Sequence, residues 1–189
     1  MRRGFKSQAE RLAQEHRANV GLGPNDRLEP RAFLEHDGFL VWEPSDVPGL
    51  EPEELYQLTV LDPDSWSGVT INSERHKLII VNPKHPTGRQ ANTLMHEWSH
   101  TELNHKPNRV DRSDAGLLLL SDYPKELEEE ADWLAGCMLL PRDGLLNHCR
   151  AGRDAQAVAD HYGVSRQLAT WRIGATGVKR QLGARARQY

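Results

Sequence analysis

The spacing of apolar residues along the chain predicts a helix at its start. Apolar positions recur at helical spacing from Phe5 to His16, and a cluster of glycine and proline at residues 21–24 ends the pattern. We expect a second short helix after Pro30. The chain therefore opens with helical structure.

Several later segments are short apolar runs that we expect to form strands, and all but the last are rich in β-branched or aromatic residues. They are GFLVWEP at 38–44, GVTIN at 68–72, KLIIVNP at 77–83 and LLLLSD at 117–122. The second and third flank a short polar turn, which predicts a hairpin. The polar stretch KPNRVDRSDAG at 106–116 has no such pattern, and we expect it to be a loop.

Two strong helices are predicted around these strands. The first starts at Thr87, keeps Leu94 and Trp98 on one side, and lacks glycine or proline after its first turn until Pro107. The second runs from about 125 to 140 and is closed by Pro141. Together the elements indicate an α+β fold, in which a small, mainly antiparallel sheet packs on the first of these helices and the C-terminal part is helical.

The length of 189 residues suits one medium domain with a small addition. We predict a main domain over residues 1–150. A segment with the features of a helix-turn-helix follows at 151–178, where Gly163 marks the turn and Ser165 caps the second helix. Residues 179–189 are predicted to be a basic, flexible tail.

Charge and cysteine content narrow the classes of function. The net charge of −3 excludes a whole-molecule attraction to nucleic acid or anionic lipid. Only two cysteines, Cys137 and Cys149, are present, which is too few for the disulfide framework of a secreted protein. The sequence has no signal-peptide pattern and no run long enough to span a membrane. We therefore expect a cytoplasmic protein that has no membrane partner.

His96-Glu97-Trp98-Ser99-His100 forms an H-E-x-x-H motif inside the first strong helix. Residues four apart share a helix face, so both imidazoles can reach one metal ion. Glu97 is offset from them and is placed to contact the metal-bound water instead. The alternative is a helix with two surface histidines, but its apolar neighbours favour a buried site. The motif predicts a zinc centre with Glu97 as the catalytic base.

A catalytic zinc ion needs a third protein ligand. Glu128 on the second strong helix is a candidate, and Glu126, Glu129 and Glu130 compete with it. Asp132 lies one turn after Glu128 and is suited to accept a hydrogen bond from a zinc-binding histidine, for which we expect His96. Taken alone, this acidic run also fits the solvated start of a helix, where the helix dipole favours carboxylates.

The string E-E-E-A-D-W-L-A-G-C-M-L-L-P at 128–141 resembles the E-x-x-A-N-x-F-A-x-x-L-L-M-P signature of the ImmA/IrrE family of metallopeptidases. In this resemblance Asp132 replaces the usual asparagine and Leu134 the usual phenylalanine. The opening helix and the segment YGVSRQLATWRI at 162–173 are also similar to the family. The resemblance implies that Glu128, rather than its acidic neighbours, is the third zinc ligand.

The resemblance further implies a site-specific zinc endopeptidase. Its expected substrate is a regulatory protein, a helix-turn-helix transcriptional repressor, whose cleavage relieves repression. Peptide hydrolysis also needs a hydrogen-bond donor for the oxyanion. The sequence offers His105, Tyr123, Arg142 and His148 without selecting among them, although the helix dipole alone explains His105.

Two other functions compete with the peptidase. The first is a DNA-binding regulator with a structural zinc ion, in which Arg166, Gln167 and Arg172 face a phosphate backbone and the basic tail adds charge. It is the less favoured, because one basic element supplies few phosphate contacts. The second is a partner-binding module of the toxin–antitoxin type with a vestigial site. The presence of Glu97 disfavours it, because a structural metal site needs no base.

Overall fold

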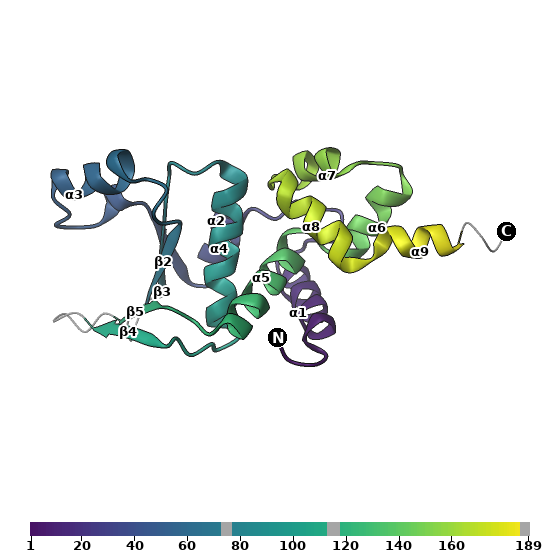
Figure 1. Ribbon diagram of the computed structural model, residues 1–189, viewed down its shortest axis with the longest axis horizontal. Helices are drawn as coiled ribbons and strands as arrows, with labels where there is room; N and C mark the ends of the chain where they lie inside the picture. Colours follow the sequence, from purple (N-terminus) through teal and green to yellow (C-terminus); the bar gives the residue numbers. More distant parts are fainter. Residues whose placement is uncertain (73–76, 113–117, 186–189) are drawn as a thin grey trace. The chain divides into compact units, whose positions relative to one another are not determined.

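A computed structural model describes residues 1–72, 77–112 and 118–185 of the chain (Figure 1). The chain forms two compact units. The first contains Met1 and residues 29–131, and the second contains residues 2–28 and the chain from Asp132 onward. The functional boundary expected at residue 150 stays a prediction.

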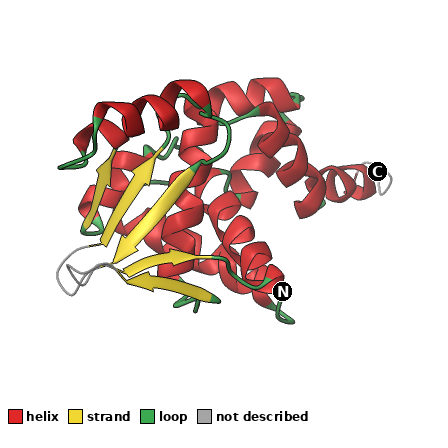
Figure 2. Cartoon of the chain, turned by 60° about the vertical axis from the view of Figure 1, so that its left-hand side comes forward, coloured by secondary structure: helices red, strands yellow, loops and turns green. Residues whose placement is uncertain are grey.

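The first unit contains one mixed sheet, which is drawn in yellow in Figure 2. Its strand order is β1-β3-β2-β5-β4 among the described residues, and only β1 and β3 are parallel. The β2–β3 pairing, in which Thr70 lies opposite Ile79, confirms the predicted hairpin. The strands are β1 (Phe39–Trp42), β2 (Gly68–Asn72), β3 (Lys77–Val81), β4 (Arg109–Arg112) and β5 (Leu118–Ser121).

Strand β4 corrects the expectation that the whole stretch 106–116 is a loop. Its residues Arg109–Arg112 pair antiparallel with β5, and Val110 lies opposite Leu120. The sequence RVDR has no apolar alternation that would predict a strand. The strand therefore forms because β5 offers it backbone hydrogen bonds, which is a property of the tertiary fold. Residues 113–117 lie outside the described part.

Helix α4 (Thr87–Glu102) packs against β2 and β3, and α2 (Pro30–His36) packs against β1 and α4. The face of α4 that meets the core carries Leu94, Met95 and Trp98, all of which are almost fully buried. Neither α3 (Pro52–Tyr56) nor the π-helical turn η2 (Gln57–Leu61) was predicted from the sequence. A short 3-10 turn, η1 (Pro44–Asp46), precedes them, and α5 (Lys125–Leu139) begins in this unit.

The regular elements of the second unit, among its described residues, are all helices. Gly163 ends α7 in the left-handed conformation with a φ of 68°, and Ser165 caps α8 by accepting a hydrogen bond from the Leu168 amide. These features confirm the two helices predicted around this turn. The unit contains α1 (Phe5–Asn19), the end of α5, α6 (Arg142–Arg150), α7 (Ala155–Tyr162), α8 (Arg166–Thr176) and α9 (Val178–Arg185).

Helix α9 occupies residues for which we predicted a flexible tail. It packs against α6 and α8, and Val178 at its start is fully buried. Burial of this side chain stabilises the helix in a way that its basic composition does not indicate. Residues 186–189 lie outside the described part.

Two buried arginines organise the centre of this unit. Arg17 donates to the backbone carbonyls of Met138, Gly23 and Asp26. Arg172 is fully buried and forms an ion pair of 2.6 Å with Glu10. The expectation that Arg172 faces a phosphate backbone is therefore wrong. A charged residue on the apolar side of a short helix can be buried in the core when an acidic residue there forms an ion pair with it.

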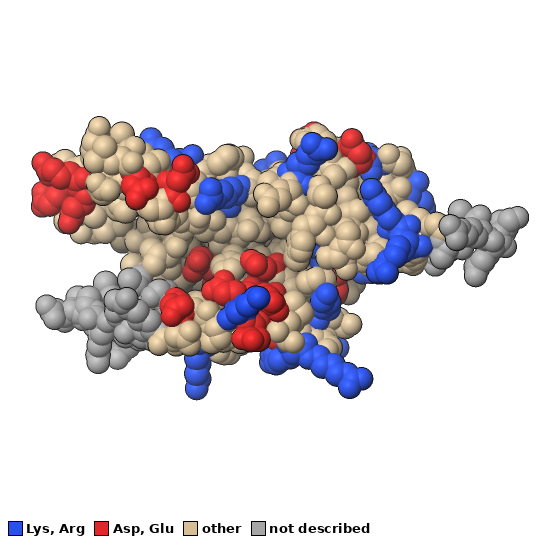
Figure 3. All heavy atoms as spheres, viewed as in Figure 1, with Lys and Arg blue, Asp and Glu red and all other residues tan. Residues whose placement is uncertain are grey.

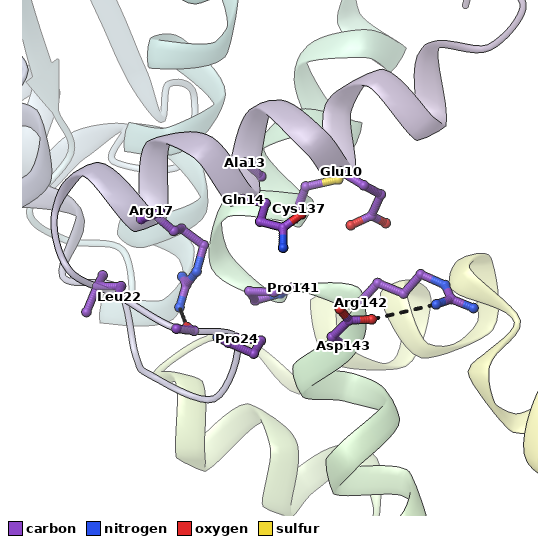
Figure 4. A pocket seen from close by; sticks show the side chains of 12 residues that line it. Glu10, Ala13, Gln14, Arg17, Leu22, Pro24, Cys137, Pro141, Arg142 and Asp143 are labelled. Atoms are coloured by element: carbon purple, nitrogen blue, oxygen red, sulfur yellow. Dashed lines mark hydrogen bonds and ion pairs between the residues drawn. The ribbon is translucent and has the colours of Figure 1, made fainter.

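A cavity of about 410 Å³ lies in the same unit. Figure 4 shows Glu10 and Gln14 of α1 on one side of it, and Pro141, Arg142 and Asp143 on the other. Buried Cys137 contributes to its wall. Among the described residues, no helix is both long enough and apolar enough to cross a bilayer.

Candidate metal centre

Helix α4 carries His96, Glu97 and His100 and is held firmly in the first unit. Trp98 donates from its indole nitrogen to Asp37 at 2.8 Å and packs edge-to-face on Phe33 at 5.2 Å between ring centroids. This anchor fixes the rotation of the helix about its axis. His96 and His100, one turn apart, consequently project on the same side.

The side chains of His96, His100 and Glu128 converge on one point. The Nε2 atoms of the two histidines are 3.1 Å apart. One carboxylate oxygen of Glu128 lies 3.1 Å from Nε2 of His96, and the other lies 3.7 Å from Nε2 of His100. Three ligand-type residues thus offer atoms that all lie within 4.8 Å of one another.

These distances suit a tetrahedral metal ion. Zinc bonds of about 2.0–2.1 Å at tetrahedral angles place neighbouring ligand atoms about 3.3 Å apart, close to the spacing found here. Two imidazoles and one carboxylate also match the donor set of catalytic zinc sites that keep a position for water. The three residues therefore form a candidate metal site whose chemistry fits zinc.

The protonation of His100 also favours metal binding. Burial, together with the charges of His96 and His105, lowers the pKa of His100 to about 3. Its ring is therefore neutral at neutral pH and retains a lone pair for a metal, as a histidine ligand must.

Glu97 lies beside this cluster and is held by the sheet. The Thr70 hydroxyl on β2 donates to Oε2 of Glu97 at 2.6 Å, and the Thr70 side chain is almost fully buried. Burial of the Glu97 carboxyl raises its pKa, an effect that the Thr70 hydrogen bond and the charge of His96 partly offset. A carboxylate whose pKa is moved towards neutrality is suited to accept and return a proton.

Gly68 allows β2 to approach α4 at this position. A Cβ atom added at Gly68 would lie 2.5 Å from Cγ2 of Thr93 and 3.8 Å from Cγ of Glu97. Alternation along β2 places Gly68 and Thr70 on the same face. Sequence reasoning missed both residues. The strand alternation puts both residues on one face of β2, but it does not show which helix packs against that face.

Tyr123 and His105 both contact the ring of His100. The Tyr123 ring stacks on the His100 ring with 3.7 Å between centroids and 25° between planes. Burial and the charges of Glu97 and Glu128 raise the pKa of Tyr123 to about 12, so its hydroxyl keeps its proton. Of the four donor candidates from the sequence, the structure places these two beside the metal cluster within the first unit.

The sequence of the chain matches the IrrE N-terminal-like domain of peptidase family M78 over residues 59–173. This stretch is more than half of the chain and contains the H-E-x-x-H motif, Glu128 and Asp132. The chain belongs to the ImmA/IrrE metallopeptidase family. No curated protein matches it significantly.

In this ImmA/IrrE protein the competing acidic residues of α5 lie apart from the cluster. Glu126 is exposed, Glu129 pairs with the amino terminus of Met1 at 3.3 Å, and Glu130 is fully buried near His105. Glu128 is thus the acidic residue that joins the two histidines. The roles assigned to these residues, and the hydrogen bond from His96 to Asp132, stay predictions. Asp132 belongs to the second unit.

Proposed function

We propose that this protein is a cytoplasmic zinc endopeptidase that cuts a regulatory protein at a specific peptide bond. The observation that carries the proposal is the convergence of His96, His100 and Glu128 beside Glu97. A structural site needs ligands but no neighbouring base, whereas hydrolysis needs both. Two free cysteines fit a reducing compartment.

A bound zinc ion would supply Lewis acidity, which activates a water molecule and polarises the scissile carbonyl. His96, His100 and Glu128 would hold this ion. Glu97 takes a proton from the attacking water and passes it to the leaving amine. Thr70 holds the carboxylate of Glu97 in place during both transfers. Glu97 on α4 thus transfers the protons, and Thr70 on β2 positions it.

We assign the donor for the oxyanion to Tyr123. Its hydroxyl is protonated at neutral pH, and its ring is fixed against His100. A protonated phenol in a fixed position can donate a hydrogen bond to the charge that develops on the carbonyl oxygen. His105 also contacts His100, but its ring nitrogens face His100 and Glu130.

The proposed substrate is a helix-turn-helix transcriptional repressor whose cleavage derepresses its genes. This part rests on family membership alone. A test would mix the purified protein with the repressor encoded beside its gene and follow cleavage by mass spectrometry, with zinc and with a chelator. We expect a single zinc-dependent cut, one zinc ion per chain, and the loss of both in His96→Ala. Absence of a metal from these histidines would refute the proposal.

A second candidate, direct DNA binding, has one supporting observation. Lys and Arg side chains lie over α8 and α9 in Figure 3, and Arg166, Lys179 and Arg180 are exposed. The burial of Arg172 removes one of the expected phosphate contacts. We therefore rank this function below the peptidase. A binding assay on duplex DNA at two salt concentrations tests it directly.

A further inference from the structure

Two polar side chains continue inward from the candidate metal ligand His100. Its Nε2 atom faces the cluster, and its Nδ1 atom lies 3.0 Å from Nδ1 of His105. Nε2 of His105 in turn lies 3.6 Å from a carboxylate oxygen of Glu130. The side chains of His105 and Glu130 are 3% and 1% exposed, so this row of groups is closed to solvent.

The end of α4 explains how His105 reaches His100. Asn104 adopts a left-handed conformation with a φ of 52°, and the His105 amide donates to the His100 carbonyl at 2.9 Å. This is the hydrogen bond of a Schellman-type helix end, and it folds the chain back over the last turn. The imidazole of His105, five residues after His100, is thereby brought into contact with the His100 ring.

The tautomers of the two rings follow from this geometry. If Nε2 of His100 is given to a metal, its proton lies on Nδ1 and is donated to Nδ1 of His105. His105 then carries its own proton on Nε2, which lies 3.6 Å from the Glu130 carboxylate, an ion-pair distance that is too long for a direct hydrogen bond. All donors run in one direction, from the metal ligand to a buried anion.

Glu130 needs an explanation of its own. Its neighbour Glu129 on the same helix is exposed and pairs with the N-terminus, whereas Glu130 is almost fully buried. Burial of a carboxylate is costly unless donors face it. If the acidic start of α5 were only a solvated helix end, it would not bury a carboxylate beside His105. Among the described contacts of Glu130 is the ring of His105, which this carboxyl group can orient.

We propose that His105 and Glu130 form a positioning pair that fixes the tautomer and orientation of His100 for metal binding. The inference rests on the proposed function, because it requires a metal on Nε2 of His100. Neither residue belongs to the cluster of metal-ligand atoms, so both act through His100. Carboxylate-supported histidines of this kind raise metal affinity by about 10- to 100-fold.

The test measures Zn²⁺ affinity by competition with a chromophoric chelator. Glu130→Gln keeps the shape of the side chain and removes its charge, and His105→Gln removes the ring. We expect each variant to bind Zn²⁺ about 10- to 100-fold more weakly than wild type. Glu129→Gln is the matched control, since it makes the same charge change one residue away at the surface. It should stay within about twofold.

Two further measurements separate positioning from a structural role. Thermal unfolding of the metal-free variants reports the fold alone, and Co²⁺ spectra report the geometry at the metal. A pair that acts as one unit also predicts that the double variant binds Zn²⁺ no more weakly than the weaker single variant. Spectral change together with weakened Zn²⁺ binding supports the proposal. A loss of metal-free stability with unchanged Zn²⁺ affinity overturns it.

The failure of this proposal is distinguishable from that of the proposed function. Should wild type bind no Zn²⁺ through His96 and His100, both proposals fall. Should wild type bind Zn²⁺ while Glu130→Gln and His105→Gln bind it equally well, only the positioning pair is wrong. If Glu130→Gln does not fold, His105→Gln alone decides the result.

Discussion

The two compact units each contain a polar cluster, buried in the second unit and partly exposed in the first, and the clusters differ in how their atoms face one another. In the second unit, the guanidinium groups of Arg17 and Arg172 meet carbonyl oxygens and the Glu10 carboxylate, so donors face acceptors. In the first unit, His96, His100 and Glu128 turn ring nitrogens and carboxylate oxygens, the atom types that bind metals, towards the same point. Such an arrangement is favourable only when a cation or shared proton occupies its centre.

This contrast separates a structural cluster from a candidate functional one. A cluster in which donors face acceptors needs no bound ligand, and its loss should affect stability. A cluster of converging acceptors is incomplete without a ligand, and its loss should affect metal binding and chemistry. The variants below test this distinction.

The largest effect is expected for Glu97→Gln. Glutamine cannot accept the proton of the attacking water, so cleavage of the repressor should slow by about 10²- to 10⁴-fold while bound zinc stays at one ion per chain. Steady-state cleavage and elemental analysis measure the two properties. The exposed Glu126→Gln serves as the control. If Glu97→Gln still relieves repression fully while the partner stays uncut, the protein works by binding and the enzyme hypothesis is wrong.

In the second unit, Arg172→Ala should lower the free energy of unfolding by about 2–4 kcal/mol, because it leaves Glu10 beside apolar surface without its partner. Zinc affinity should not change. Urea unfolding provides the measurement, and Arg166→Ala at the exposed start of the same helix should stay within about 0.5 kcal/mol. A clear loss of zinc binding in Arg172→Ala would contradict the separation of the two clusters.

Asp132→Ala tests the predicted hydrogen bond to His96. If Asp132 orients that ring, the variant should bind zinc about 10- to 100-fold more weakly. The chelator competition assay gives the affinity, and Asp143→Ala on α6 is a control with the same change of charge. Wild-type affinity in Asp132→Ala would remove this residue from the site.

Gly68→Ala should have the smallest effect. The added Cβ crowds Thr93, which we expect to cost about 1–3 kcal/mol and to displace Glu97, lowering the cleavage rate with zinc retained. The second change Thr93→Ser removes the crowding Cγ2 atom and should restore the rate. Gly174→Ala, with nothing within 4 Å of its new Cβ, is the control. No recovery in the double variant would show that this contact is not the cause.

Much of the candidate site is determined by the sequence itself. His96, Glu97 and His100 lie within one helix, and the period of a helix places residues four apart on one face whatever the rest of the chain does. The choice of Glu128 from an acidic run came from resemblance, because spacing alone left four glutamates open. Most helices and the β2–β3 hairpin were likewise readable from local patterns.

The tertiary structure decided the contacts between segments that are far apart in sequence. It brings Thr70 and Gly68 to Glu97, and it buries Glu130 near His105. It also makes residues Arg109–Arg112 a strand and most of the predicted basic tail a helix, and it buries Arg172 in the core. In each case the local pattern was weak or pointed elsewhere. The outcome depended on which partner surface packing brought to the residue, and local spacing does not encode that choice.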